Sequence, residues 1–324
     1  MILTFILFLA VIINKPGNDL KQKIEDLEKQ SGGILGVAAV NLQNGQQFRN
    51  NADHLLPMAS TYKFPIGIRV LQEVETGNLN LEDSVMVGLA DRRWGWSPIT
   101  KEINQKGPRY FTYAELLERM VGYSDNAASD VLLSTVGGPE AVTKMLRENG
   151  IEKINVNRPE HFIHADIYQV PRSSLKELTY EAFVKELEET QPAKLQNGFE
   201  AFLQDERDMA TPEAFVQLMQ KFLDHQFLNK KYTKVLFDLM VAAPVRNSLI
   251  KAGVPEGAIV GHKSGGVFDV NGINGGENDI GIIYLPGAQK PILLAILTSR
   301  TKISGKERQE LIAGITEMVI NELK

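Results

Sequence analysis

The sequence predicts an α/β fold in which a sheet built from both ends of the chain carries an inserted helical lobe. Short runs rich in β-branched residues lie near both ends of the 324-residue chain, and helical apolar spacing fills the middle. No internal repeat or low-complexity linker divides the chain. Terminal strands that flank a long helical segment are typical of a layered α/β domain with an insertion.

The composition is that of an ordinary globular protein. Apolar residues make up 43% of the chain and charged residues 23%, which argues against a disordered, collagenous or membrane protein. The net charge of -5 argues against nucleic acid as a partner, because such binders present a basic surface. The absence of cysteine excludes thiolate catalysis, thiolate metal sites and disulfides, and it leaves the redox compartment open.

Residues 1–17 form a signal-like segment. Its first part, MILTFILFLAVII, is apolar apart from Thr4 and shorter than the roughly 20 residues that a helix needs to cross a bilayer. It suits an export signal, although no Lys or Arg precedes it and no small-x-small cleavage site follows. We expect a periplasmic or secreted protein without stable membrane insertion after processing. An uncleaved anchor or a mis-assigned start is the alternative.

Residues 18–58 and 228–324 are expected to form a discontinuous α/β subdomain. In NDLKQKIEDLEKQ, apolar residues recur at helical spacing, with Asn18 or Asp19 as the N-cap and a Gly-Gly pair as the stop. ILGVAAVNL, an Asn-Gly turn and QQFRN indicate a β-hairpin. AIVGHKSGG, NDIGIIYLP and PILLAILTS predict three more strands, and a helix follows from about Lys306. The result is a five-stranded antiparallel sheet flanked by N- and C-terminal helices.

Residues 59–227 are expected to form an all-helical subdomain. The stretches FPIGIRVLQEVETG, YAELLERMVGYS, NAASDVLLSTVGG, PEAVTKMLRENG and EAFVQLMQKFLDH each show helical apolar spacing. A seam between two such lobes is a common place for an active site.

A serine and a lysine stand three residues apart in MASTYKFPI. On a helix, Ser60 and Lys63 would share one face. Burial or a neighbouring cation can lower the pKa of a lysine enough for its amine to take the proton of a serine. A serine near a helix N-terminus also offers a free backbone N–H to an oxyanion. The alternative is a serine that simply caps a helix, with a solvated lysine one turn on.

Two later stretches favour the catalytic interpretation. GYSDNAAS contains Ser-Asp-Asn at 124–126, and VGHKSGG contains Lys-Ser-Gly at 263–265 on an expected strand. Serine-x-x-lysine, Ser-Asp-Asn and Lys-Ser-Gly in this order are the motifs of class A β-lactamases and penicillin-binding proteins. The chain resembles the class A serine β-lactamases over nearly its whole length after the signal-like segment. WSPITKEI and EHFIHAD resemble the PER and VEB branch. The resemblance implies the fold shared by β-lactamases and DD-peptidases.

The resemblance implies a role for each motif residue. Ser60 would be the acylated nucleophile and Lys63 its proton partner. Ser124 would relay a proton to the lactam nitrogen, and Lys263 would hold that serine and the substrate carboxylate. The implied substrate-binding residues are Trp96, Asn126, His164, Ser264, Gly265 and Gly266. Within this set, Asn126 would bind the acylamide side chain, and Gly266 N–H would form the oxyanion hole with Ser60 N–H. For His164, a loop-packing role is the alternative.

Hydrolysis of an acyl-enzyme needs a second base to activate water. In VNRPEHFIHAD, Arg158 and Glu160 match the Ω-loop arginine and the deacylating glutamate of the family, and Asp208 matches the aspartate that pairs with the arginine. The Ω-loop region 158–208 is much longer than usual and includes the helix-like LTYEAFVKELEET. This insertion is either a surface elaboration, or it displaces Glu160 or covers the cleft.

The stretch after Lys263 departs from the family pattern. SGGVFDVNGINGGENDIG contains no Arg or Lys, so the arginine that many relatives use for the substrate carboxylate is missing there. Arg246 in PVRNSL is the nearest candidate, with simple solvent exposure as the alternative. The glycines of this stretch suggest a mobile hairpin rim that admits bulky cephalosporin substituents.

The resemblance implies a monomeric β-lactamase that hydrolyses penicillins and cephalosporins through an acyl-enzyme and confers antibiotic resistance. Its partner would be the small-molecule β-lactam, without a cofactor. We expect no metal, because His161 and His164 are not accompanied by HExxH or a second cluster. A penicillin-binding DD-peptidase or transpeptidase and a non-hydrolytic β-lactam sensor are the alternatives. Whether Lys63 or Glu160 takes the first proton is disputed for the family.

Overall fold

The computed structural model describes residues 16–175 and 177–324, so the signal-like segment lies almost wholly outside the described residues. Helix α1 (Pro16–Ser31) begins before the N-cap predicted at Asn18 or Asp19. Proline suits the first turn of a helix because it lacks the N–H that would have no partner there. None of the described helices is both long and apolar enough to span a bilayer.

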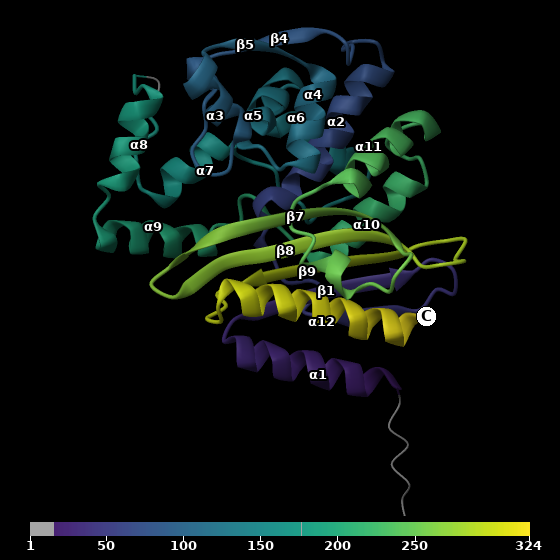
Figure 1. The fold of residues 1–324 in the computed structure, drawn as a ribbon. Helices are drawn as coiled ribbons and strands as arrows, with labels where there is room; N and C mark the ends of the chain where they lie inside the picture. Colours follow the sequence, from purple (N-terminus) through teal and green to yellow (C-terminus); the bar gives the residue numbers. More distant parts are fainter. Residues whose placement is uncertain (1–15, 176) are drawn as a thin grey trace, which may run out of the picture.

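A five-stranded antiparallel sheet forms one layer of the molecule, as predicted (Figure 1). Its strands are β1 (Ile34–Asn41), β2 (Gln47–Asn50), β7 (Ile259–Val270), β8 (Ile273–Tyr284) and β9 (Ile292–Ser299). They lie in the order β2-β1-β9-β8-β7, so the two ends of the chain meet where β1 pairs with β9. Strands β7 and β8 extend beyond the predicted ranges and stay paired up to Val270 opposite Ile273.

Helices cover both faces of the sheet, which explains the long apolar runs of β1 and β9. In β1, Leu35 and Val37 belong to a core shared with α1 and the C-terminal helix α12 (Gly305–Leu323). Ala38 and Val40 belong to the core on the opposite face, under the helical lobe. Because side chains alternate between the two faces of a strand, a strand that is buried on both sides shows no polar alternation.

The helical lobe lies across the sheet from α1 and α12 (Figure 1). Its helices are α2 (Lys63–Glu75), α3 (Pro98–Lys106), α4 (Tyr113–Gly122), α5 (Asn126–Thr135), α6 (Gly138–Glu148), α7 (Glu160–Ile167), α8 (Tyr180–Glu188), α9 (Pro192–Gln204) and α10 (Pro212–Leu223). Helix α11 (Lys230–Ala242) contacts both α4 and β7 and so joins the lobe to the sheet.

Two short strand pairs accompany these helices, and the sequence does not reveal them. Strand β4 (Ser84–Val87) pairs with β5 (Arg109–Thr112), and β3 (Leu56–Pro57) pairs with β6 (Met209–Ala210). Segments of two to four residues are too short to show a hydrophobic period.

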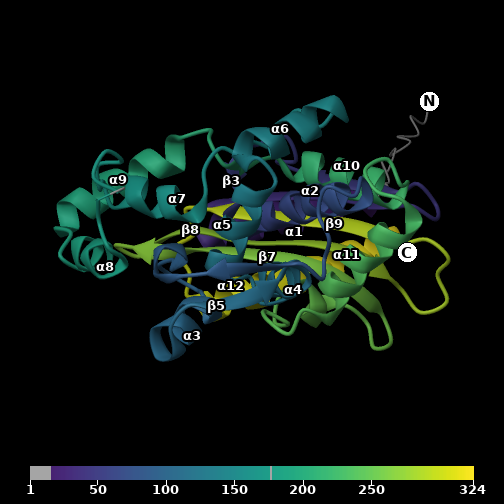
Figure 2. The ribbon, with the colours of Figure 1, turned by 90° about the horizontal axis from the view of Figure 1, so that it is seen from above.

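The insertion between Arg158 and Asp208 contains α7, α8 and α9. Figures 1 and 2 both place α9 beside the tip of the β7–β8 hairpin. Helix α9 contacts α7 and β7, and Asn271 at the hairpin tip donates a hydrogen bond of 2.6 Å to Gln196 of α9. The rim that the sequence suggested to be mobile therefore packs against the insertion.

Candidate active site

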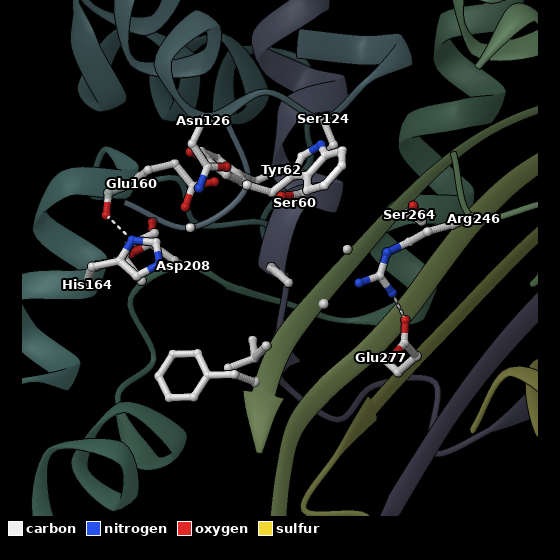
Figure 3. A pocket seen from close by; sticks show the side chains of 18 of the residues that line it. Ser60, Tyr62, Ser124, Asn126, Glu160, His164, Asp208, Arg246, Ser264 and Glu277 are labelled. Atoms are coloured by element: carbon white, nitrogen blue, oxygen red, sulfur yellow. Dashed lines mark hydrogen bonds and ion pairs between the residues drawn. The ribbon is translucent and has the colours of Figure 1, made fainter. Parts of the chain in front are cut away.

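A cleft of about 750 Å³ opens between the helical lobe and strand β7 (Figure 3). The predicted site residues that line it are Ser60, Trp96, Ser124, Asn126, Glu160, His164, Asp208, Ser264, Gly265 and Gly266. Lys63 and Lys263 are buried behind this lining, and their amino groups bond to residues within it. Three motifs that are far apart in the sequence therefore meet at one place.

Ser60 is half-buried in a 3-10 turn, η1 (Ala59–Tyr62), and Lys63 begins helix α2. The two residues are thus not on one α-helix as predicted, although positions i and i+3 eclipse each other in a 3-10 turn. Gly265 allows β7 to pass close to the serine, since a Cβ atom there would lie 2.6 Å from Ser60 N. Within residues 16–175 and 177–324, Ser60 N–H has no backbone acceptor. This donor is free for an oxyanion.

Lys63 connects the second motif to the Ω-loop. Its Nζ donates to the backbone oxygen of Ser124 at 2.8 Å and to Asn126 Oδ1 at 2.7 Å, and it lies 3.1 Å from Glu160 Oε1. The side chain is fully buried. An ammonium group has three N–H donors, so these acceptors use all of them. The backbone N–H of Lys63 donates to the backbone oxygen of Ser60, but in the part of the chain that the structure describes no hydrogen bond joins the two side chains.

Glu160 is the first residue of α7 and is held as a carboxylate. Burial opposes its ionisation, but the charges of Lys63 and then of His164 keep the pKa of this carboxyl below its ordinary value. Asp130 fixes the backbone, because its Oδ1 accepts from Glu160 N at 2.8 Å. Arg93 in turn donates to Asp130 at 2.5 Å. A general base must be ionised and positioned, and Glu160 meets both requirements.

Ser124 of the second motif is hydrogen-bonded to Lys263 of the third motif. Lys263 Nζ donates to Ser124 Oγ at 2.9 Å and to the backbone oxygen of Ser264 at 2.9 Å. Burial, followed by the nearby charge of Lys63, lowers the pKa of Lys263 well below its ordinary value. Because Ser124 Oγ accepts from Lys263, its own proton is free to be donated. Asp125 caps α5 and anchors this loop.

The remaining predicted ligand-binding side chains lie at the cleft wall and mouth. Asn126 accepts from Lys63 and donates to the backbone oxygen of Trp94 at 3.0 Å, which leaves one amide N–H for a ligand. Trp96 is 53% exposed, and its ring N–H donates to the backbone oxygen of Tyr123 at 2.7 Å. It therefore presents a fixed aromatic surface at the cleft mouth.

His164 lies one turn after Glu160, and its ring lines the cleft. Its Nδ1 bonds to the backbone oxygen of Glu160 at 2.9 Å. A Cβ atom at Gly95 would lie 3.4 Å from His164 Nε2 and 3.2 Å from Asn126 Nδ2. His164 thus packs against the loop and also borders the ligand space, so the two roles considered for it are compatible.

Arg158 holds the two ends of the Ω-loop region together. Its side chain is 1% exposed, and its Nε donates to Asp208 at 2.5 Å. Its Nη1 donates to Asp166 at 2.8 Å and to Asp205 at 3.1 Å. The predicted pair of Arg158 and Asp208 is therefore the buried part of a cluster in which Arg158 contacts three carboxylates.

Arg246 lies against the backbone of β7 at the edge of the cleft. A Cβ atom at Gly266 would lie 2.6 Å from its Nη2, so this glycine makes room for the guanidinium. Arg246 is paired with Glu277 (Figure 3), and Arg308 of α12 lies 3.8 Å from the same carboxylate. Arg246 is therefore a built part of the cleft and not merely a solvated side chain.

Comparison with known proteins identifies the family. The sequence profile of the Beta-lactamase enzyme family matches residues 19–323. The chain belongs to this family. β-Lactamase VEB-1 of Pseudomonas aeruginosa is 26% identical over 99% of this chain and 96% of its own length. β-Lactamase OXY-2 of Klebsiella oxytoca is 29% identical over 94% of this chain and 89% of its own length.

Solved structures agree with this assignment. The TLA-1 extended-spectrum β-lactamase is 26% identical, covers 96% of this chain and 100% of its own, and has a TM-score of 0.77. A variant of an ancestral class A β-lactamase of Gram-negative bacteria is 29% identical over 94% of this chain and 97% of its own, with a TM-score of 0.74. The predicted class A fold is confirmed, and the similarity to VEB-1 agrees with the predicted branch.

Removal of Arg158 should destabilise this β-lactamase. Arg158→Met leaves Asp208 buried without its cation, and breaking a buried ion pair in this way costs about 3 to 5 kcal/mol of unfolding free energy. Arg172→Met is the matched control, because Arg172 pairs with the same Asp166 but is 41% exposed; the expected loss is at most about 1 kcal/mol. Urea unfolding measures both. Similar losses for the two variants would contradict a structural role for the buried cluster.

Three acidic residues of this β-lactamase were not predicted from the sequence, namely Asp130, Asp166 and Asp205. Asp130 could have been found, since it lies one helical turn after Asn126 and so on the same face of α5. Asp166 and Asp205 gave no sequence signal beyond their charge. Among the described residues, no group of three or more His, Cys, Asp or Glu side chains is arranged so that it could hold a metal ion. His161 instead packs on Phe183, and burial lowers its pKa to about 4.

Proposed function

We propose that this β-lactamase hydrolyses the lactam amide of penicillins and cephalosporins through an acyl-enzyme on Ser60. The observation that carries this proposal is the buried pair of Lys63 and Glu160, 3.1 Å apart, beside a serine in an open cleft. A protein that only acylates needs no base for water. A carboxylate that is ionised, positioned by its backbone and close to the serine supplies that base.

In the acylation step, Ser60 Oγ attacks the lactam carbonyl carbon while the Lys63–Glu160 pair takes its proton. Lys63 can accept this proton only after it has passed one of its own to Glu160, because all three of its N–H groups are donated. The backbone N–H groups of Ser60 and Gly266 receive the oxyanion. Ser124 then donates its proton to the lactam nitrogen as the C–N bond breaks, and Lys263 stabilises the Ser124 oxygen. The proton that the Lys63–Glu160 pair took from Ser60 returns to Ser124, so the pair is ready for the second step.

In the deacylation step, Glu160 takes a proton from a water molecule, which attacks the ester carbonyl. The C–O bond to Ser60 breaks, and the serine oxygen recovers a proton from the Lys63–Glu160 pair. The product is the ring-opened acid.

Lys263 and Arg246 bind the substrate carboxylate at the β7 side of the cleft, and Glu277 holds the Arg246 guanidinium in place.

The cellular role follows from this chemistry. The protein acts as a monomer in the periplasm or outside the cell, where it destroys β-lactam antibiotics before they reach their targets and so confers resistance. The apolar stretch at residues 1–13 supports export.

Continuous turnover of nitrocefin tests the proposed activity. We expect linear hydrolysis far beyond one equivalent per protein molecule, because Glu160 allows the acyl-enzyme to be released. A burst of one equivalent followed by a halt would instead indicate the sensor. Cleavage of a D-Ala-D-Ala peptide without nitrocefin turnover would indicate the DD-peptidase.

A further inference from the structure

We infer that the insertion between Arg158 and Asp208 gives the cleft an apolar wall that binds an uncharged, apolar acyl side chain of the substrate. This inference rests on the proposed function, because it names which β-lactams the same site prefers.

The wall is made by side chains from three elements that all line the cleft. Helix α7 contributes Ile163 and Ile167, helix α9 contributes Phe202, and strand β7 contributes Val267 and Phe268. These residues also belong to one apolar cluster between the insertion and the hairpin. The insertion therefore neither displaces Glu160 nor closes the cleft, and it extends the cleft with an apolar surface.

Close backbone packing holds α9 in this position. A Cβ atom at Gly198 would lie only 2.0 Å from the backbone oxygen of Ile167, so α9 can approach the end of α7 only because this residue is glycine. A Cβ atom at Gly275 of β8 would lie 3.0 Å from the ring of Phe199. The two glycines let α9 contact both α7 and the hairpin, which makes the wall a fixed feature of the fold.

Aromatic contacts fix the opposite side of the wall. The ring of Phe268 lies 6.1 Å from the ring of Phe199 and 5.7 Å from the ring of Tyr168. Such spacings are typical of favourable aromatic pairs. Phe268 is only partly buried, so it keeps surface that a ligand can cover.

The polar groups of the site orient a substrate toward this wall. Figure 3 shows Asn126, Glu160 and His164 on one side of the cleft, and Arg246 with Glu277 on the other. A β-lactam whose carboxylate is bound near Arg246 and whose side-chain amide is bound by Asn126 extends its acyl group past α7. The groups that it meets there are apolar, and burial of apolar area favours binding. An aromatic or branched side chain fits this chemistry.

The test compares two penicillins that share one nucleus and one carboxylate. Benzylpenicillin carries an aromatic acyl side chain, and 6-aminopenicillanic acid carries a bare amine. For Phe202→Ala we expect kcat/KM for benzylpenicillin to fall about tenfold or more, the range for lost contacts in an apolar pocket. For 6-aminopenicillanic acid the change should stay within about twofold. Phe202→Leu should restore most of the loss, and Phe268→Ala should repeat the selective loss from the β7 side.

Phe183→Ala is the matched control, because Phe183 is a buried phenylalanine of the same insertion that does not line the cleft. It should lower the melting temperature without changing the ratio of the two kcat/KM values. An equal loss on both substrates in Phe202→Ala and Phe268→Ala would overturn the inference, as would a changed ratio in Phe183→Ala. If the parent protein hydrolyses 6-aminopenicillanic acid but not benzylpenicillin, the inference about the apolar wall is wrong and the proposed function stands. If it hydrolyses neither, both fail.

Discussion

Glu160→Gln is expected to give a protein that is acylated by benzylpenicillin and then remains acylated. The amide keeps the size of the carboxylate but cannot take a proton from water, and a lost general base typically slows its step by about 10²- to 10⁴-fold. Ser60, Lys63, Ser124 and Lys263 are unchanged, so the adduct should still form, at a rate that depends on whether Lys63 must first pass a proton to Glu160. Intact-mass measurement over time should show a stable adduct in the variant, whereas the parent returns to its free mass.

Glu206→Gln is the matched control for this experiment. Glu206 is an exposed glutamate of the same insertion, and its replacement removes the same charge at a residue that does not line the cleft. This variant should turn over benzylpenicillin like the parent. If Glu160→Gln also turned over at the parent rate, Glu160 would not be the base, and the argument against a sensor or a DD-peptidase would lose its main support.

The acylation rate of Glu160→Gln carries further information on the first proton. In the structure, Lys63 donates all three of its N–H groups, one of them to Glu160. If Lys63 becomes a free amine by passing a proton to Glu160, the variant should also be acylated more slowly. If acylation keeps the parent rate, Lys63 acts without this transfer. The two steps can thus be assigned from one time course.

The sequence predicted the elements whose patterns are long or whose chemistry is specific. Strand β1 could be predicted because its apolar run is bounded by turn residues, and the three motifs because each brings unusual residue types to a defined place. Pro16 shows the limit at an element boundary, where the N-cap preference of Asn18 or Asp19 competes with the fit of proline in a first turn. The packing of α9 could not be predicted, because the role of Gly198 depends on a carbonyl more than 30 residues away.

The local geometry of the nucleophile was also beyond sequence reasoning. A serine and a lysine three residues apart fit an α-helix and a 3-10 turn equally well. Whether the serine is buried or open to the cleft depends on where β7 lies, which the motif does not show. Gly265 and Gly266 have no side chains, so their pattern alone does not say which neighbours approach them. In the structure these are Ser60 N and the Arg246 guanidinium, respectively. The motif therefore predicts the chemistry, and the contacts of β7 determine access to it.

Ser60→Ala is expected to abolish covalent capture and to lower kcat/KM for nitrocefin by at least about 10⁴-fold, because no other group then forms the ester. Ser60 is half-buried in a turn and donates no hydrogen bond from its side chain in the described part of the chain. Its replacement by alanine should therefore leave the melting temperature within about 1 °C to 2 °C of the parent, since such a surface change alters stability by less than about 0.5 kcal/mol.

The same variant distinguishes Ser60 from Ser124 as the nucleophile. Lys263, Asn126 and Arg246 are intact in Ser60→Ala, so benzylpenicillin should still bind reversibly, which calorimetry can measure. No mass increase should follow, even after long incubation. A covalent adduct that maps to Ser124 would instead show that the Lys263-bonded serine is the nucleophile and that the Lys63–Glu160 pair serves another step.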